Sequence, residues 1–270
     1  FMKEKKEIIS TVEEKELNAP NGLAVGILSV LVYVAAAVGV IPAAMALDNG
    51  STAFGAPLMV MCVLWLCVGW IPFMGVKVIR PNEALVLTLF GKYTGTLKKE
   101  GIFFVNPFSI AVNPASAQKI ASGKNPQEAT APVGKKLSLK AMTLDNKKQK
   151  INDRDGNPIE ISIVVIWKIA NTAKAVFNVD NYEEYVSIQS DSALRDVAGA
   201  YPYDGDGENV KSLRGSSAEI AGHLRDMLQS RVDDAGIEVI EARITHLAYA
   251  PEIAAAMLQR QQAAALIGGR

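Results

Sequence analysis

The chain has 270 residues, 49% of them hydrophobic, which is enough for one or two domains. It carries 28 Lys and Arg against 28 Asp and Glu, and this formal net charge of zero argues against a nucleic-acid-binding protein. Both cysteines, Cys62 and Cys67, lie in one apolar run, which excludes a disulfide framework in the rest of the chain.

Two long uncharged runs come first along the chain. Residues 22–47 contain 26 positions without a charge and residues 53–76 contain 24, and only residues 48–52 separate them. At 1.5 Å of rise per residue, each run forms a helix about 36–39 Å long, which exceeds a hydrocarbon core of about 30 Å. We therefore predict a transmembrane helical hairpin over 22–76, after an N-terminal segment 1–21. We prefer this interpretation to a buried hairpin of a soluble core and to a signal peptide.

Basic residues predict how this hairpin is oriented. The loop 48–52 has none, whereas four lysines precede the hairpin, and residues 77–150 hold 13 Lys and Arg against 4 Asp and Glu, a balance of +9. The positive-inside rule then places both termini and everything after residue 76 in the cytoplasm, as a two-span protein of the cell inner membrane. Residues 151–270 hold 11 basic and 18 acidic residues, a balance of −7, and predict an acidic surface that faces the cytoplasm.

Strand signals resume immediately after the hairpin. Apolar residues rich in valine, leucine and isoleucine predict strands at 76–79 and 84–90. Gly91 and Gly95 then mark a hairpin turn region. Residues 111–136 are rich in Ala, Ser, Pro, Gly and Lys, and predict a loop.

A second set of strands follows the loop. The pair Asp155-Gly156 is a strong turn signal, and residues 237–244 predict a further strand. After that turn, apolar residues alternate with mostly polar ones, as in a half-buried strand: Ile159, Ile161, Ile163, Val165, Trp167 and Ile169.

Three helices complete the prediction. They are expected at 182–198, at 216–235, where Ser216 and Glu219 have the spacing of a capping box, and at 251–267, where Pro251 suits the first helical position. The order of strands, helices and a further strand predicts an α+β domain with a mostly antiparallel sheet.

One short apolar stretch, residues 102–108, stands inside the basic region. It is too short to span a bilayer, and its neighbouring lysines attract anionic headgroups. We predict that it enters the membrane boundary as a wedge, and the alternative left open is that its phenylalanines fill the domain core. The residues expected at the membrane are Ile102, Phe103, Phe104, Val105, Phe108, Lys92, Lys98, Lys99 and Trp70.

The sequence offers no recognisable catalytic or metal-binding pattern. His223 and His246 have no Cys or His neighbour at metal-ligand spacing, and no nucleophile stands beside a recognisable base. The hypothesis is therefore a protein that is not an enzyme and uses no metal or cofactor. An enzyme carried by a membrane anchor is the remote alternative.

Three segments, in this order, resemble the SPFH family of stomatin, prohibitin and flotillin, in particular its bacterial stomatin-like branch. They are VKVIRPNEALVLTLFGKYTGTLKKEGIFFVNPF, TLDNKKQKINDRDGNPIEISIVVIWKIANTAKAVFNVDNYEEYVSIQSDSALRDVAGAYPYD and LRGSSAEIAGHLRDMLQSRVDDAGIEVIEARITHLAYAPEIAAAMLQRQQAAA. The resemblance implies a two-part domain over 77–250 that lies on the membrane. It also implies that 251–270 begins a coiled-coil helix, through which copies assemble into large rings or cages.

The last helix supports assembly on its own residues. Its apolar positions form an incomplete stripe, which suits contact with identical helices better than burial, although packing on its own sheet is the alternative. The predicted interface between copies consists of Ile253, Met257, Leu258, Leu266 and Ile267.

Two functional hypotheses follow. The first is a scaffold that binds itself and anionic lipids and encloses a membrane microdomain with its proteins. The alternative is a regulatory partner of a membrane-anchored protease or of a small integral membrane protein. Compared with the family, the loop 111–136 is long, the last helix stops early, and Phe1 precedes Met2, so we expect the sequence to be incomplete.

Overall fold

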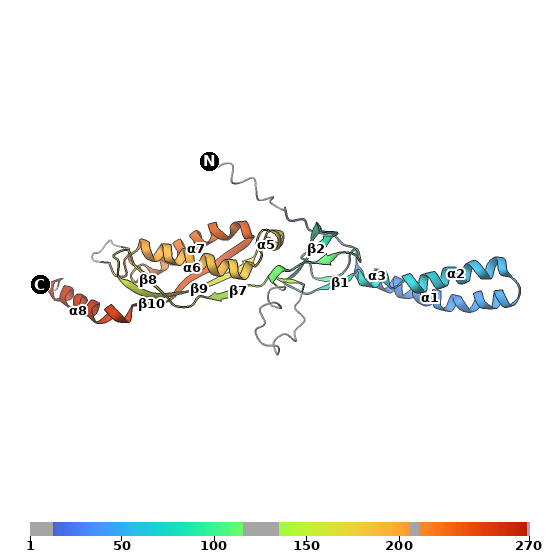
Figure 1. Ribbon diagram of the computed structural model, residues 1–270, viewed down its shortest axis with the longest axis horizontal. Helices are drawn as coiled ribbons and strands as arrows, with labels where there is room; N and C mark the ends of the chain where they lie inside the picture. Colours follow the sequence, from blue (N-terminus) through green and yellow to red (C-terminus); the bar gives the residue numbers. More distant parts are fainter. Residues whose placement is uncertain (1–12, 116–134, 206–210, 269–270) are drawn as a thin grey trace. The chain divides into compact units, whose positions relative to one another are not determined.

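The computed structural model describes residues 13–115, 135–205 and 211–268 (Figure 1). These residues fall into two compact units, of which the first contains Glu14–Asn113 and the second begins at Leu139. Apolar helices, antiparallel strands and further helices follow one another, so the predicted α+β class is confirmed. The predicted domain limits at residues 21, 76 and 250 remain predictions.

Two apolar helices open the first unit and pack against each other as a hairpin (Figure 1). Helix α1 (Gly22–Asp48) begins where the Asn21 side chain accepts a hydrogen bond from the Leu23 amide. Helix α2 (Thr52–Val68) runs back, and the short helix α3 (Ile71–Met74) follows it.

The sequence analysis expected one helix over the second apolar run, to residue 76. The structure instead divides this run. Helix α2 ends at Val68, and Gly69 caps it with an amide that donates to the Trp65 carbonyl. The helix cannot continue regularly because Pro72 has no amide hydrogen for the carbonyl four residues before it. Val76 already belongs to strand β1 (Val76–Ile79).

The strands of the first unit form two small antiparallel sheets. Strand β1 pairs with β4 (Gly101–Phe104). Strand β2 (Glu83–Leu89) pairs with β3 (Lys92–Leu97), β5 (Ile110–Ala111) and β6 (Leu137–Ser138). Residues of both sheets contribute to one compact core, which consists of Ile79, Leu85, Leu87, Leu97 and Val105.

The predicted hairpin between β2 and β3 is confirmed. Its turn places Phe90 at φ 49° and Gly91 at φ 82°, the left-handed conformation that a two-residue type I′ turn requires at both central positions. Phenylalanine is an unusual occupant of such a position, where Asn, Asp or Gly is preferred.

Strand β9 (Pro158–Ile169) is the centre of the sheet in the second unit. It pairs antiparallel with β10 (Ile237–Tyr249) on one side and with β7 (Met142–Asp145) and β8 (Gln149–Asn152) on the other. The predicted turn before β9 is confirmed, with Gly156 at φ 82°. The six alternating residues of β9 are each no more than 3% exposed, which confirms the predicted buried face.

Helices α6 (Tyr182–Ala200) and α7 (Ser217–Val232) cover one face of this sheet (Figure 1). Helix α6 starts at Asn181, whose side chain accepts hydrogen bonds from two amides of the first turn. After α7, a short 3-10 turn η2 (Asp233–Ala235) leads to Gly236, whose φ of 67° turns the chain into β10.

Two details of the helices differ from the sequence analysis, and one agrees with it. The capping box is wrong, because the Ser216 side chain accepts no capping hydrogen bond and the Glu219 carboxylate pairs with Lys211 instead. The short helix α5 (Thr172–Phe177) was not predicted, since six residues are too few to show a helical period. Helix α8 (Pro251–Gly268) starts at the predicted proline.

Candidate membrane interface

The outer surface of the α1–α2 hairpin is apolar. Leu31 of α1 is 61% exposed and Met61 of α2 is 68% exposed. Helix α1 and the segment Thr52–Met74 are long and apolar enough to cross a membrane. In the most hydrophobic stretch of each, 0% and 17% of it, respectively, is buried. A core helix of a soluble protein would be mostly buried, so these exposed apolar helices indicate membrane association.

Small residues form the contact between the two helices. A Cβ atom added at Gly39 would lie 3.0 Å from the Cys62 sulfur, and one added at Gly55 would lie 3.1 Å from the Ala43 carbonyl oxygen. Such close approach is what holds helices together in lipid, where no hydrophobic force drives one helix onto another. Cys62 is accordingly buried in this contact, whereas Cys67 is exposed.

The residues just before α1 fold back along the first unit, and we call residues 14–21 the N-terminal strap. The Thr96 amide donates to the Lys15 carbonyl at 2.8 Å, and the Leu17 amide donates to the Thr96 carbonyl at 3.0 Å. The strap thus pairs with the edge of β3. At its other end, the Phe104 amide donates to the Pro20 carbonyl at 3.0 Å. Sequence analysis missed the strap, because these backbone bonds leave no periodic pattern of side chains.

Strand alternation divides the predicted wedge between two faces. Phe103 packs against the core of the first unit and Val105 is buried in it, so both occupy the core position that was the alternative. Ile102 and Phe104 are partly exposed on the opposite face, since successive strand residues point to opposite sides. Val78 stands opposite Ile102 in the register and is 56% exposed. The β1–β4 ribbon therefore has an apolar outer face, made of Val76, Val78, Ile102 and Phe104.

Three more apolar side chains project from the first unit. Phe108 follows a turn in which its own amide donates to the Asn106 side chain at 3.0 Å, and it is 62% exposed. Ile110 of β5 and Phe90 of the β2–β3 turn are also exposed. Sequence analysis did not select Val78, Phe90 or Ile110, although a phenylalanine beside Gly91 in a tight turn was a visible signal.

The polar residues predicted at the membrane differ in their surroundings. Lys98 forms an ion pair with Glu14 of the strap, with 2.7 Å between Nζ and Oε2. Lys92 and Lys99 are exposed at the two ends of the β3 region. Trp70 is exposed in the turn between α2 and α3. Lys92, Lys99 and Trp70 thus lie on the surface, whereas Lys98 holds the strap.

Helix α8 carries the predicted assembly residues on more than one face. Ile253 and Met257, one turn apart, are partly buried, whereas Leu258 is 57% exposed. Leu266 and Ile267 belong to α8, but their side chains lie outside the described part of the chain. Leu258 is therefore the exposed apolar residue on which contact between copies is best tested.

The base of α8 is fixed by polar contacts. Lys150 Nζ of β8 lies 2.6 Å from Glu252 Oε1 in the first turn of the helix, and this hydrogen-bonded pair lowers the pKa of Glu252 and raises that of Lys150. Just before the helix, Tyr249 stacks on Tyr203 with 3.9 Å between ring centroids. Burial, reinforced by the charge of Asp204, raises the pKa of Tyr249 to about 12.

Among the described residues, no group of three or more His, Cys, Asp or Glu side chains could hold a metal ion. The two histidines lie on separate elements. His223 of α7 has its Nδ1 atom 3.0 Å from the Tyr201 hydroxyl, and His246 lies in β10.

Comparisons with known proteins agree with this architecture. Residues 77–266, which are most of the chain, match the SPFH domain / Band 7 family. Stomatin from Mus musculus is 21% identical over 202 residues, which cover 74% of this chain and 58% of stomatin. An uncharacterized protein from Methanothermobacter thermautotrophicus is 23% identical over 206 residues, which cover 76% of this chain and 55% of that protein. The chain thus spans little more than half the length of these relatives. It belongs to the SPFH domain / Band 7 family.

Proposed function

We propose that this protein is a membrane-anchored scaffold subunit, whose copies assemble into a large ring or cage around a patch of membrane and its proteins. Helix α1 and the segment Thr52–Met74 cross the bilayer, and the strap and both folded units lie on its cytoplasmic side. The protein would then be a member of the bacterial stomatin-like branch of its family, in a cell inner membrane.

The observation that carries this proposal is that the exposed apolar surface of the α1–α2 hairpin adjoins the apolar outer face of the β1–β4 ribbon. Both ends of the hairpin are fixed against β4: the Val105 amide donates to the Gly75 carbonyl at 2.9 Å, and a Cβ atom at Gly22 would meet the Phe103 backbone at 2.6 Å. Wherever the hairpin enters a bilayer, the apolar outer face of the β1–β4 ribbon stands beside the entry point. Exposed apolar surface of this extent favours contact with lipid over contact with water.

Charge supports the orientation. The loop between α1 and α2 has no basic residue, whereas residues 77–150 carry a balance of +9. Backbone hydrogen bonds tie the strap to β3, so the residues on both sides of the hairpin belong to one folded unit. Basic residues next to membrane spans remain in the cytoplasm, where they also meet anionic headgroups.

Two serine-to-cysteine variants test the orientation in intact cells. Both are made after replacing Cys62 and Cys67 by Ala, because those are the chain's own thiols. An impermeant thiol reagent should label Ser51→Cys, in the loop of the hairpin, and should not label Ser217→Cys, an exposed position of α7. The opposite labelling would overturn the cytoplasmic placement of the folded units.

A matched pair on α8 tests assembly. Leu258→Glu introduces a charge at an exposed apolar position, and Gln259→Glu introduces the same charge at the exposed polar position beside it. Light scattering of the detergent-extracted protein should show small species for Leu258→Glu and a large particle for Gln259→Glu. A large particle in both cases would mean that copies do not meet through α8. Small species of the unaltered chain, purified in fixed ratio with one integral membrane protein, would favour the regulatory alternative.

A further inference from the structure

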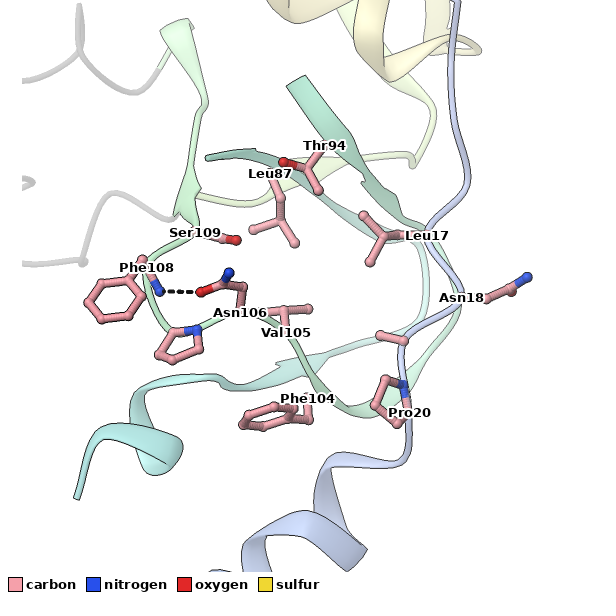
Figure 2. Close-up of a pocket in the computed structure, with 12 residues that line it drawn as sticks. Leu17, Asn18, Pro20, Leu87, Thr94, Phe104, Val105, Asn106, Phe108 and Ser109 are labelled. Atoms are coloured by element: carbon pink, nitrogen blue, oxygen red, sulfur yellow. Dashed lines mark hydrogen bonds between the residues drawn. The ribbon is translucent and has the colours of Figure 1, made fainter. Parts of the chain in front are cut away.

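A cleft of about 570 Å³ opens in the first unit between the N-terminal strap and the residues that follow β4 (Figure 2). Leu87 of β2 and Thr94 of β3 contribute to its wall. In Figure 2 the side chains of Leu17, Leu87 and Val105 turn toward the cleft, whereas Asn18 points away from it. The volume lies in the range of about 300–1,000 Å³ that small-molecule sites occupy.

The lining of this strap cleft selects an apolar occupant. Two of its polar members have partners: the Asn106 side chain accepts the Phe108 amide, and the Thr94 hydroxyl donates to the Lys92 carbonyl. Asn18 points away from the cleft, and Ser109 adds one hydroxyl to its lining. The other lining residues are alanine, leucine, valine, proline and phenylalanine. Water gains few hydrogen bonds in such a site, so a hydrocarbon chain is the ligand that it stabilises.

The place of the cleft identifies the source of that chain. Pro20, which lines the cleft, stands two residues before α1. Phe104, beside Pro20 in the lining, packs so close to Gly75 that a Cβ atom there would lie 2.7 Å from its ring. The cleft is thus bounded by residues next to both ends of the helical hairpin. With the hairpin in a bilayer, lipid acyl chains are the most concentrated apolar molecules at this level.

We propose that the strap cleft binds one acyl chain of a bilayer phospholipid. The inference rests on the proposed function, because it requires the hairpin to lie in the membrane. A neighbouring groove shares strap residues with the cleft and is lined by Glu16, Lys98 and Lys99. Lys98 is already paired with Glu14, so the exposed Lys99 is the cation that suits the phosphate of a phospholipid headgroup.

Photo-cross-linking in proteoliposomes tests the proposal on the whole chain. The probe is phosphatidylglycerol with a diazirine near the end of one acyl chain, and the labelled residues are identified by peptide mass spectrometry. Lipid that touches only the surface should label the hairpin and Phe108. A chain inside the cleft should also label Leu17 and Thr94, which line the cleft and are only partly exposed.

Filling the cleft with a side chain should remove the labelling of the residues that line it. Thr94→Phe places a ring in the cleft, and Ser109→Phe does so from another lining position, in case the first variant folds poorly. Thr143→Phe, at an exposed position of β7, is the matched control. We expect both filling variants to lose labelling at Leu17 while the hairpin remains labelled, and the control to keep both.

The outcomes separate this inference from the function on which it rests. Hairpin labelling without labelling of Leu17 or Thr94 in the unaltered chain would overturn the inference and leave the membrane anchor intact. An unlabelled hairpin would overturn the anchor and the inference together. Labelling of Leu17 by a free fatty-acid probe but not by the phospholipid probe would show a different occupant and overturn the proposal.

Discussion

The helix pairs α1–α2 and α6–α7 use similar apolar residues in opposite ways. In α6 and α7, Leu194 and Leu224 are fully buried, because the sheet below supplies an apolar surface for one side of each helix. In α1 and α2, Leu31 and Leu64 are about three-fifths exposed, and no described element covers them. The comparison shows that apolar composition alone does not place a helix in a core. The sheet removes the apolar residues of α6 and α7 from water, and a bilayer has to do so for those of α1 and α2.

One substitution at two leucines tests this difference most strongly. Leu224→Ala removes a side chain that is 0% exposed, and we expect it to lower the free energy of unfolding by about 2–5 kcal/mol. Leu31→Ala removes a side chain that is 61% exposed and should change that free energy by less than about 0.5 kcal/mol. Amide hydrogen exchange, of β9 for Leu224→Ala and of β2 for Leu31→Ala, with the chain in lipid nanodiscs, is the measurement.

Equal losses for both leucines would contradict the comparison. They would mean that the α1 surface is covered by protein in the assembled state. A loss for Leu224→Ala alone would leave lipid as the partner of the hairpin.

The N-terminal strap offers a second test, inside the first unit. Leu17 is partly buried against the core, so Leu17→Ala should weaken the first unit by about 1–2 kcal/mol, less than a fully buried leucine would. Exchange of the β3 amides reports this loss. Asn18→Ala, which changes an exposed neighbour on the same strap, should leave exchange unchanged. Equal protection in both variants would mean that the strap does not stabilise the unit.

How far the sequence predicts the structure depends on how long each pattern is. Strand β9 shows six apolar residues at alternate positions, so its buried face was predictable. Strand β4 has Ile102, Phe103 and Phe104 in succession, and a run of apolar residues gives both faces the same composition. Only the pairing of β4 with β1, and the core beneath it, distinguishes the two faces.

The polar and structural details were harder still to predict. The strap is held by backbone hydrogen bonds to β3 and β4, which any residues could make. The ion pair between Lys98 and Glu14 joins residues 84 positions apart, and the sequence has no signal for it. The break at Gly69 and Pro72, by contrast, was visible, and the sequence analysis gave too much weight to the length of the run.

Phe103 packs on the core whereas Phe108 is exposed, so the same substitution at the two phenylalanines should change stability by different amounts. We expect this difference to be smaller than those above. Phe103→Leu alters a side chain packed on the core and should lower the stability of the first unit by about 1 kcal/mol. Phe108→Leu alters a side chain that is 62% exposed and should change stability by less than about 0.5 kcal/mol. Hydrogen exchange of β2 measures both. A larger loss for Phe108→Leu would place that ring in a contact between copies.

The smallest expected effect concerns the attachment of α8 at its base. The hydrogen-bonded ion pair with Lys150 lowers the pKa of Glu252 below its ordinary 4.5. Protonation of a group whose folded pKa is lowered opposes the folded arrangement, so the attachment is complete above pH 4.5 and is lost as pH falls through the lowered pKa. Lys150, whose pKa is raised above 10.5, stays charged throughout this range. Both side chains are exposed, and the effect on global stability is therefore small.

A local probe can detect what a melting curve cannot. A spin label at Ala255→Cys, an exposed position one turn into α8, should become more mobile as pH falls from 7 to 3, on a background with Cys62 and Cys67 replaced by Ala. Glu252→Gln removes the titrating carboxylate, so its label should be mobile at pH 7 and show no further step. If Glu252→Gln kept the step, Glu252 would not be the titrating group. Because α8 is the helix through which we expect copies to meet, a loosened base would let its direction vary, and the mass of the assembled particle should then spread at low pH.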